Sequence, residues 1–257
     1  MNKRAILIAS VGTSRSEALE VTTYRLKQEI QEQFPDISCY VGFSSHSILM
    51  KMKEKGMECC GIPEVLEKML EDGINEIVIQ PTNLLGGLEL SGLEQQIDTY
   101  KKSFDKISMG NPLLSSKEDY IRTLQALSDA AEPEEDEALV LVGHGSEHSA
   151  GNTYQNLEYT AYVQGYRNVF VGTMEEKNRN MTFRKLRASG YKRVCLMPLL
   201  FVAGYHAVKD ITAESNSWKS CLVNEGYEVR PFLKGVGELP LVRKIFIEHL
   251  ESAINEE

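Results

Sequence analysis

Two stretches of the chain share one pattern, an apolar run that ends in a glycine turn. Residues 5–14 read Ala-Ile-Leu-Ile-Ala-Ser-Val-Gly-Thr-Ser, and residues 138–146 read Ala-Leu-Val-Leu-Val-Gly-His-Gly-Ser. A short apolar run bounded by a turn is typical of a buried strand of a parallel sheet. A segment with helical spacing follows the first copy at residues 17–34, and another follows the second copy at residues 152–164. We therefore expect residues 5–9 and 138–142 to be the first strands of two strand–helix units.

Strand-like and helical segments alternate through the rest of the chain. Further strands are expected at residues 37–43, 76–80, 168–171, 193–197 and 228–232. Further helices are expected at residues 63–70, 92–104, 118–130 and 240–254, and one more ends at residue 189. Alternation of this kind predicts parallel sheets whose faces are covered by helices.

The two halves of the chain align with each other in the same order. Residues 40–43 match residues 170–173, and residues 79–89 match residues 196–206 without a gap. The identity between the halves is weak, but the order of the matches and their setting after strands agree. We infer an α/β fold with two similar lobes, each a parallel sheet flanked by helices.

An acidic connector separates the two halves. Residues 132–137 place five acids and one proline in six positions, a composition that indicates a solvated segment rather than a core element. We expect an N-terminal lobe at residues 1–131 and a C-terminal lobe at residues 138–257 that carries the candidate metal ligands. The sequence leaves open whether the final helix of one lobe packs on the other.

Composition excludes several classes of protein. The 257 residues carry a net charge of −9, and five of these negative charges lie in the connector. A general nucleic-acid binder needs a basic face, and a membrane span needs about 20 apolar residues, which no run here approaches. The apolar run after Met-Asn-Lys-Arg reads as a strand rather than as a signal peptide, and the five cysteines are odd in number without CxxC spacing. We expect a cytoplasmic protein with reduced thiols and no nucleic-acid or membrane partner.

Three side chains that can ligate a metal follow strands of the second half. His144, Glu175 and His206 each come shortly after one of its first three expected strands. In open α/β folds, ligands bind where loops leave the carboxyl ends of the strands. Two imidazoles and one carboxylate suit Co²⁺, Fe²⁺, Ni²⁺ or Zn²⁺, and three protein ligands leave coordination positions open. The plainer interpretation is that the histidines are exposed loop residues and that Glu175 belongs to an ordinary turn.

Several stretches of the chain resemble one enzyme family. They are the run at residues 5–14, the Val-Gly-His-Gly-Ser turn at residues 142–146, and Met-Pro-Leu-Leu-Phe-Val-Ala-Gly-Tyr-His-Ala at residues 197–207. With shorter matches between and beyond them, the resemblance covers nearly the whole chain. These stretches resemble the class II chelatases, and among them the anaerobic cobalt chelatases, sirohydrochlorin cobaltochelatases of the CbiK type.

The resemblance implies a lyase-class metal chelatase with its active site in a cleft between the two lobes. The implied reaction inserts Co²⁺ into the tetrapyrrole sirohydrochlorin, with release of two protons, in anaerobic cobalamin biosynthesis. The family's metal ligands fall on His144, Glu175 and His206, and a further acidic residue falls on Glu89, which the internal alignment pairs with His206. We expect His144, His206 and Glu89 to be catalytic, with one histidine taking a pyrrole proton. No permanently bound cofactor is implied, because the metal is a substrate.

Residues that hold the macrocycle are expected in the loops after the first strands of both lobes and in later apolar loops. Sirohydrochlorin carries carboxylates, so hydrogen-bond donors are needed, and Thr13, Ser14 and Ser146 are candidates. Leu85 and Phe201 are candidates for the apolar wall beside the flat ring. A place in the buried core is an equally good interpretation of these two apolar residues.

Two other functions stay open at this point. Imidazole and carboxylate bind cobalt, nickel, zinc and iron alike, so a sirohydrochlorin ferrochelatase of siroheme synthesis would present the same ligands. A non-catalytic protein that binds metal or tetrapyrrole would use the same scaffold. The sequence also leaves open whether the chain forms a homo-oligomer.

Overall fold

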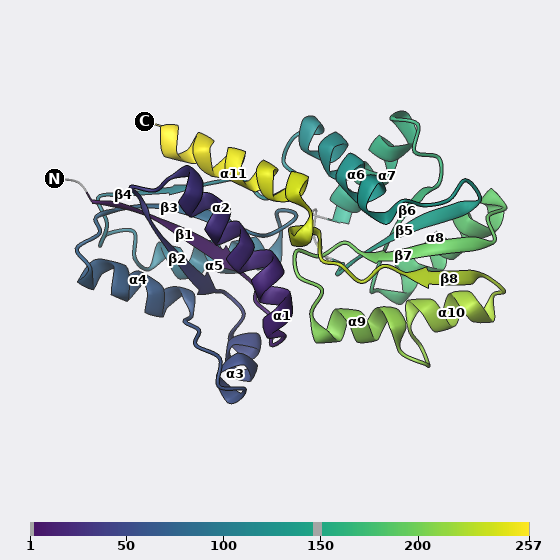
Figure 1. The fold of residues 1–257 in the computed structure, drawn as a ribbon, viewed down its shortest axis with the longest axis horizontal. Coiled ribbons are helices and arrows are strands. Elements are labelled where there is room, and N and C mark those ends of the chain that lie inside the picture. Colours follow the sequence, from purple (N-terminus) through teal and green to yellow (C-terminus); the bar gives the residue numbers. More distant parts are fainter. Residues whose placement is uncertain (1–2, 146–150, 257) are drawn as a thin grey trace. The chain divides into compact units, whose positions relative to one another are not determined.

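In the computed structural model, residues 3–145 and 151–256 are described, without the side chains of His206 and Ala207 (Figure 1). The chain divides into two compact units. Unit 1 comprises Met1–Ser115 and Arg243–Glu257, and unit 2 comprises Ser116–Val242. Among the described helices, none is both long enough and apolar enough to span a membrane.

Unit 1 is built on a four-stranded parallel sheet in the order β2-β1-β3-β4. Its elements, in chain order, are β1 (Arg4–Ser10), α1 (Ser16–Leu19), the π-helical turn η1 (Glu20–Tyr24), α2 (Arg25–Gln33), β2 (Ser38–Phe43), α3 (His46–Glu54), α4 (Ile62–Glu71), β3 (Glu76–Pro81), α5 (Leu88–Asp98), β4 (Lys106–Met109) and, from Arg243 onward, α11 (Pro240–Asn255).

Unit 2 repeats this plan with a four-stranded parallel sheet in the order β6-β5-β7-β8. Its elements are α6 (Lys117–Ala131), β5 (Glu137–Gly143), α7 (Gly151–Val163), β6 (Val169–Thr173), α8 (Glu176–Ser189), β7 (Arg193–Pro198), α9 (Tyr205–Thr212), α10 (Trp218–Asn224), β8 (Glu228–Pro231) and the 3-10 turn η2 (Val236–Glu238). The predicted α/β fold with two similar parallel sheets is confirmed.

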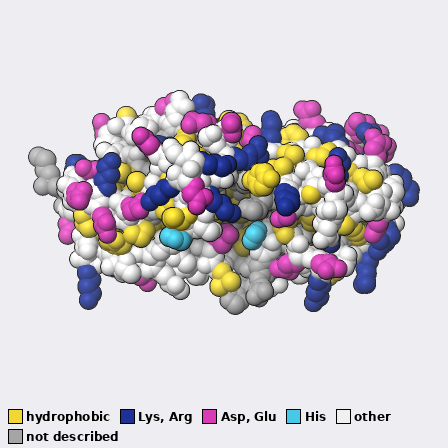
Figure 2. All heavy atoms as spheres, turned by 90° about the horizontal axis from the view of Figure 1, so that it is seen from below, with side chains coloured by type: hydrophobic (Ala, Val, Ile, Leu, Met, Phe, Trp, Pro, Cys, Tyr) yellow, Lys and Arg dark blue, Asp and Glu magenta, His cyan; other side chains and the backbone are white. Residues whose placement is uncertain are grey.

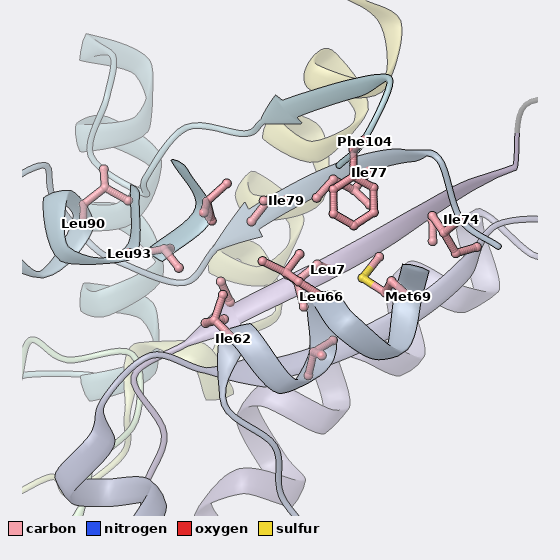
Figure 3. Packing of buried hydrophobic residues seen from close by; sticks show 14 residues of the cluster. Leu7, Ile62, Leu66, Met69, Ile74, Ile77, Ile79, Leu90, Leu93 and Phe104 are labelled. Carbon is pink, nitrogen blue, oxygen red and sulfur yellow. The ribbon is translucent and has the colours of Figure 1, made fainter. Parts of the chain in front are cut away.

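The central strand of unit 1 is apolar on both faces because helices cover both. Ala5, Leu7 and Ala9 face one cluster, in which Leu66 and Met69 of α4 point onto Leu7 (Figure 3). Ile6 and Ile8 point the other way and are also fully buried. Side chains alternate between the two faces of a strand, so an uninterrupted apolar run is what a strand covered on both faces requires.

The expected lobe boundaries differ from the compact units. Residues 117–131 form α6, which belongs to unit 2, and the C-terminal helix α11 belongs mainly to unit 1. In unit 1 the buried Arg243 donates from Nε and Nη2 to the carboxylate of Glu29 on α2, both at 2.9 Å. The ranges 1–131 and 138–257 therefore follow the repeat in the sequence, whereas the packing assigns each half's last helix to the other half's sheet.

The acidic segment 132–137 lies inside unit 2 and is only partly solvated. Glu137 opens β5 and is 1% exposed, with its carboxylate 2.6 Å from Nη2 of Arg230 on β8. Glu134 and Asp136 are exposed and pair with Arg193 on β7 at 2.5 and 3.2 Å. The expectation of a wholly solvated connector is wrong for Glu137. Its buried charge is compensated by Arg230, which lies on the edge strand of the same sheet.

Some short elements differ from the sequence-based expectation. The structure adds β4, α3, α9 and α10, and it moves the helix expected at 92–104 to Leu88–Asp98. β4 is an edge strand of four residues, all only partly buried, so its apolar pattern is weak. The loop expected to carry His206 is the start of a helix instead.

Replacing Arg230 with alanine is expected to lower the free energy of unfolding by about 1–3 kcal/mol, because the carboxylate of Glu137 stays buried without its partner. Replacing Arg193 is expected to change little, because all three of its acidic partners are exposed. Urea unfolding followed by circular dichroism measures both variants. Equal losses in the two variants would contradict the assignment of the buried pair as the stabilising one.

Candidate metal centre

Three neighbouring strands of unit 2 deliver the predicted metal ligands to one edge of the sheet. His144 follows β5 directly, and Glu175 is the N-cap of α8, two residues after β6. His206 is the second residue of α9, whose N-cap is Gly204, in the segment after β7. Because β6, β5 and β7 are adjacent and parallel, the loops at their carboxyl ends leave the same edge of the sheet.

The two glycines that flank His144 are each required by a different feature of the structure. A Cβ atom at Gly143 would lie 2.2 Å from Cε1 of Tyr154, a buried residue of α7. Gly145 has a φ of +102°, a conformation that other residues adopt with strain. A Cβ atom there would lie 2.8 Å from Oε1 of Glu175. The Glu175 carboxylate therefore lies directly against the backbone next to His144.

The Glu175 carboxylate is held by hydrogen bonds that the sequence did not reveal. Nδ2 of Asn178 donates to Oε2 of Glu175 at 2.6 Å and to Oγ1 of Thr173 at 3.1 Å. The backbone N–H of Glu175 also donates to Oγ1 of Thr173, at 3.4 Å. Thr173 is 3% exposed, whereas the side chains of Glu175 and His144 are exposed. An exposed carboxylate with a fixed position can bind a metal ion that arrives from solvent.

The structure brings Glu175 next to the His144 turn, but it does not test the complete set of three ligands. The side chain of His206 is not among those described, and Ser146 lies outside the described residues. Among the described side chains, no group of three histidines, cysteines or acids is placed to hold a metal ion. The set His144, Glu175 and His206 stays a prediction.

The internal repeat continues through the site. Gln80 pairs with Ile8 in unit 1 as Met197 pairs with Leu141 in unit 2, so the alignment of the halves agrees with the strand register. Beyond the strands, Gly12 corresponds to Gly145, and both have positive φ, +89° and +102°.

The correspondence places different chemistry at the equivalent ligand positions of the two units. Gly87 and Gly204 are the N-caps of α5 and α9, which makes Glu89 and His206 the second residues of equivalent helices. Ser45 and Glu175 are the N-caps of α3 and α8. Unit 1 thus has a valine, a serine and a glutamate where unit 2 has His144, Glu175 and His206. Glu89 is exposed.

The candidate macrocycle residues differ in how much surface they offer. Thr13 is 3% exposed, and its hydroxyl accepts from the backbone N–H of Arg15 at 3.3 Å. Ser14 and Leu85 are half-buried. Phe201 is 7% exposed and packs so closely on η2 that a Cβ atom at Gly237 would lie 2.7 Å from its ring. Leu85 is therefore the more open of the two apolar candidates.

The surface carries charges of both signs. Figure 2 shows acidic and basic side chains interspersed on one face, with histidine side chains exposed among them.

Comparison with solved structures shows which known fold the chain shares. SirB from Bacillus subtilis, in a structure with Fe3+, superimposes with a TM-score of 0.69 at 16% identity, over 98% of this chain and 96% of that chain. CbiX, described as the terminal enzyme for siroheme biosynthesis in denitrifying bacteria, superimposes with a TM-score of 0.60 at 16% identity, over 97% and 99% of the two chains. At this identity the likeness shows the fold alone, which is the fold of the chelatases.

The particular family follows from the sequence. Residues 4–255 match the family described as Cobalt chelatase (CbiK), and the chain belongs to that family. The sirohydrochlorin cobaltochelatase of Salmonella typhimurium is 30% identical over 257 residues, which are 98% of this chain and 97% of the relative. The sirohydrochlorin cobaltochelatase CbiKC of Nitratidesulfovibrio vulgaris is 29% identical, over 99% of this chain and 92% of the relative. The resemblance found in the sequence is confirmed.

Proposed function

We propose that the protein is a sirohydrochlorin cobaltochelatase, which inserts Co²⁺ into sirohydrochlorin and releases two protons, in anaerobic cobalamin biosynthesis in the cytoplasm. The observation that carries the proposal is the family match over residues 4–255, together with near full-length relatives of that name. The positions of His144 and Glu175 at neighbouring strand ends support it, because a chelatase needs metal ligands that solvent can reach.

The metal substrate is held, in this proposal, by His144, Glu175 and His206. Nitrogen and oxygen donors of this kind bind divalent metals of intermediate softness, to which Co²⁺ belongs. Three protein ligands leave coordination positions free, so that the pyrrole nitrogens of the macrocycle can replace the protein ligands one by one. A permanently bound metal would defeat the reaction, because the ion has to leave with the product.

Proton removal is the second part of the proposed chemistry. Two pyrrole N–H protons leave as the metal enters, so the charge of the ion replaces theirs. A neutral imidazole accepts a proton readily near neutral pH, because its ordinary pKa is about 6.5. We assign one proton to His144 or His206, and we assign Glu89 of unit 1 as a second proton acceptor or as a ligand that delivers the metal.

In this proposal, polar groups from the loops after the first strands of both units and apolar residues from later loops hold the macrocycle. Thr13, Ser14 and Ser146 are the proposed donors to its carboxylates, and Leu85 and Phe201 form the proposed apolar wall. Leu85 is partly exposed, which supports a contact with the macrocycle. Phe201 is buried, so its place in the wall has less support.

The test is multiple turnover by the purified protein, followed by the absorbance of the macrocycle. We expect many equivalents of sirohydrochlorin to be metallated with Co²⁺, and no faster reaction when Fe²⁺, Ni²⁺ or Zn²⁺ replaces it at equal concentration. Faster insertion of Fe²⁺ would indicate a ferrochelatase instead. Faster reaction of protoporphyrin IX would overturn the assignment of the substrate, and metallation that stops at one equivalent would indicate a binding protein.

A further inference from the structure

We propose that Asn178 and Thr173 are positioning residues for the Glu175 carboxylate, so that the carboxylate is preset for the metal before the metal arrives. The inference rests on the proposed function of Glu175 as a metal ligand. It assigns a role to two residues that carry no metal themselves.

Hydrogen bonds join the Asn178 amide to both Glu175 and Thr173. Asn178 is the third residue of α8, and its Nδ2 lies between Oε2 of Glu175, at 2.6 Å, and Oγ1 of Thr173, at 3.1 Å. Thr173 ends β6 and is 3% exposed, so its hydroxyl is fixed by the sheet. The amide of Asn178 therefore ties a flexible, exposed glutamate to a rigid strand.

The Glu175 side chain does not act as an ordinary helix cap. A side chain at an N-cap normally accepts a hydrogen bond from a backbone N–H of the first helical turn. Glu175 is the N-cap of α8, and it makes no such capping bond. Its carboxylate is instead directed to the Asn178 amide and to the Gly145 backbone, where a Cβ atom would lie 2.8 Å from Oε1. The helix gains no backbone cap from this arrangement.

Unit 1 shows what the fold itself requires at the equivalent positions. The positions equivalent to Thr173, Glu175 and Asn178 are Phe43, Ser45 and Ile48. In unit 1 a Cβ atom at Gly12 would meet Phe43 at 2.9 Å and Ile48 at 3.4 Å, so the equivalent turn packs on apolar side chains.

The turn of unit 1 forms without the polar side chains that unit 2 has at the equivalent positions. In unit 1 the strand end, the glycine turn and the helix start form with the apolar Phe43 and Ile48 at the positions of Thr173 and Asn178, so the hydrogen bonds of those two side chains have no counterpart there. The network of Thr173, Asn178 and Glu175 is therefore not a condition of the fold. It occurs in the unit whose strand ends carry the two candidate histidines.

As a consequence, the Glu175 carboxylate has little conformational freedom to lose when a metal ion binds. One oxygen, Oε2, accepts from Asn178, so the orientation of the group is set and the other oxygen can face a metal. Such outer hydrogen bonds orient metal ligands, and their removal typically lowers metal affinity by about 10-fold to 100-fold. Because this site is exposed, we expect the lower end of that range.

The experiment measures the affinity of the full-length protein for Co²⁺ alone, by the visible absorption of the bound ion without tetrapyrrole. Asn178→Ala is expected to raise the Kd for Co²⁺ about 10-fold and to raise the KM for Co²⁺ while the KM for sirohydrochlorin is unchanged. Thr173→Val is expected to weaken binding, and Thr173→Ser is expected to restore it. Asn180→Ala, at an exposed position of the same helix, is the matched control and should bind as the wild type does.

Glu175→Gln separates a failure of this inference from a failure of the proposed site. If Glu175→Gln leaves Co²⁺ binding unchanged, the proposed ligand set is wrong. If it weakens binding while Asn178→Ala stays within twofold of the wild type, only the positioning role is wrong.

A double variant distinguishes positioning from general stability. Asn178→Ala added to Glu175→Gln should cause no further loss of Co²⁺ affinity, because the group it positions is already impaired. A further loss of equal size, with a lowered unfolding midpoint, would overturn the inference. Asn178→Ser replaces the alanine variant if the latter does not fold.

Discussion

Alanine in place of His144 is expected to lower the kcat of cobalt insertion by about 100-fold to 10,000-fold, the range for loss of a group that transfers a proton. His144 is exposed and directly follows the fully buried strand β5. The turn around it depends on Gly143 and Gly145 rather than on the imidazole. The variant should therefore fold as the wild type does and lose only chemistry.

The measurement is steady-state turnover of sirohydrochlorin with Co²⁺, with far-UV circular dichroism to verify folding. His206→Ala should behave in the same way. The control is His46→Ala, because His46 is also exposed and begins α3, the helix after β2 in unit 1. If His144→Ala binds the macrocycle normally and metallates it at the wild-type rate, the proposed mechanism is wrong.

Alanine in place of Trp218 is expected to lower the free energy of unfolding by about 3–5 kcal/mol, the usual cost of removing a buried aromatic side chain. Trp218 is 1% exposed and packs edge-on against Phe183, with ring centroids 5.4 Å apart. It also covers Gly172 in β6, where a Cβ atom would lie 2.4 Å from Cη2 of the indole. Its truncation would leave a cavity between Phe183 and Gly172.

Urea unfolding should be followed by far-UV circular dichroism, because Trp218 is the single tryptophan of the chain and its loss removes the fluorescence signal. Trp218→Phe should cost less, because Nε1 is buried without a hydrogen-bond partner among the described atoms. Val223→Ala, at an exposed position of the same helix, is the control. A loss below about 1 kcal/mol for Trp218→Ala would contradict the assignment of this side chain to the core.

The fold was largely predictable because the inner strands of both sheets are strongly apolar. The run at residues 5–9 is buried on both faces, and each expected strand appears within two residues of its predicted bounds. The elements that the prediction missed are short, such as β4 with four residues. In such elements few side chains are buried, so hydrophobic spacing carries little information.

The candidate site was predictable only in part. Spacing after strands predicts His144, Glu175 and His206 as candidate ligands, because the ends of parallel strands meet at one edge, and this set stays a prediction. The sequence did not predict a role for Asn178 and Thr173, because asparagine and threonine near a helix start look like ordinary capping residues. The hydrogen bonds from Asn178 to the Glu175 carboxylate and to the Thr173 hydroxyl depend on side-chain direction, which spacing does not report.

The sequence by itself determined the two parallel sheets, the repeat that relates them and the membership of the chain in the cobalt chelatase family, because apolar runs and glycine turns are local features. Only the tertiary structure decided which sheet each last helix packs on. An apolar helix face fits many surfaces, and the pairing of Arg243 with Glu29 joins residues 214 positions apart. The same holds for the buried pair of Glu137 and Arg230 and for the support of Glu175, since each depends on side chains that meet only after the chain has folded.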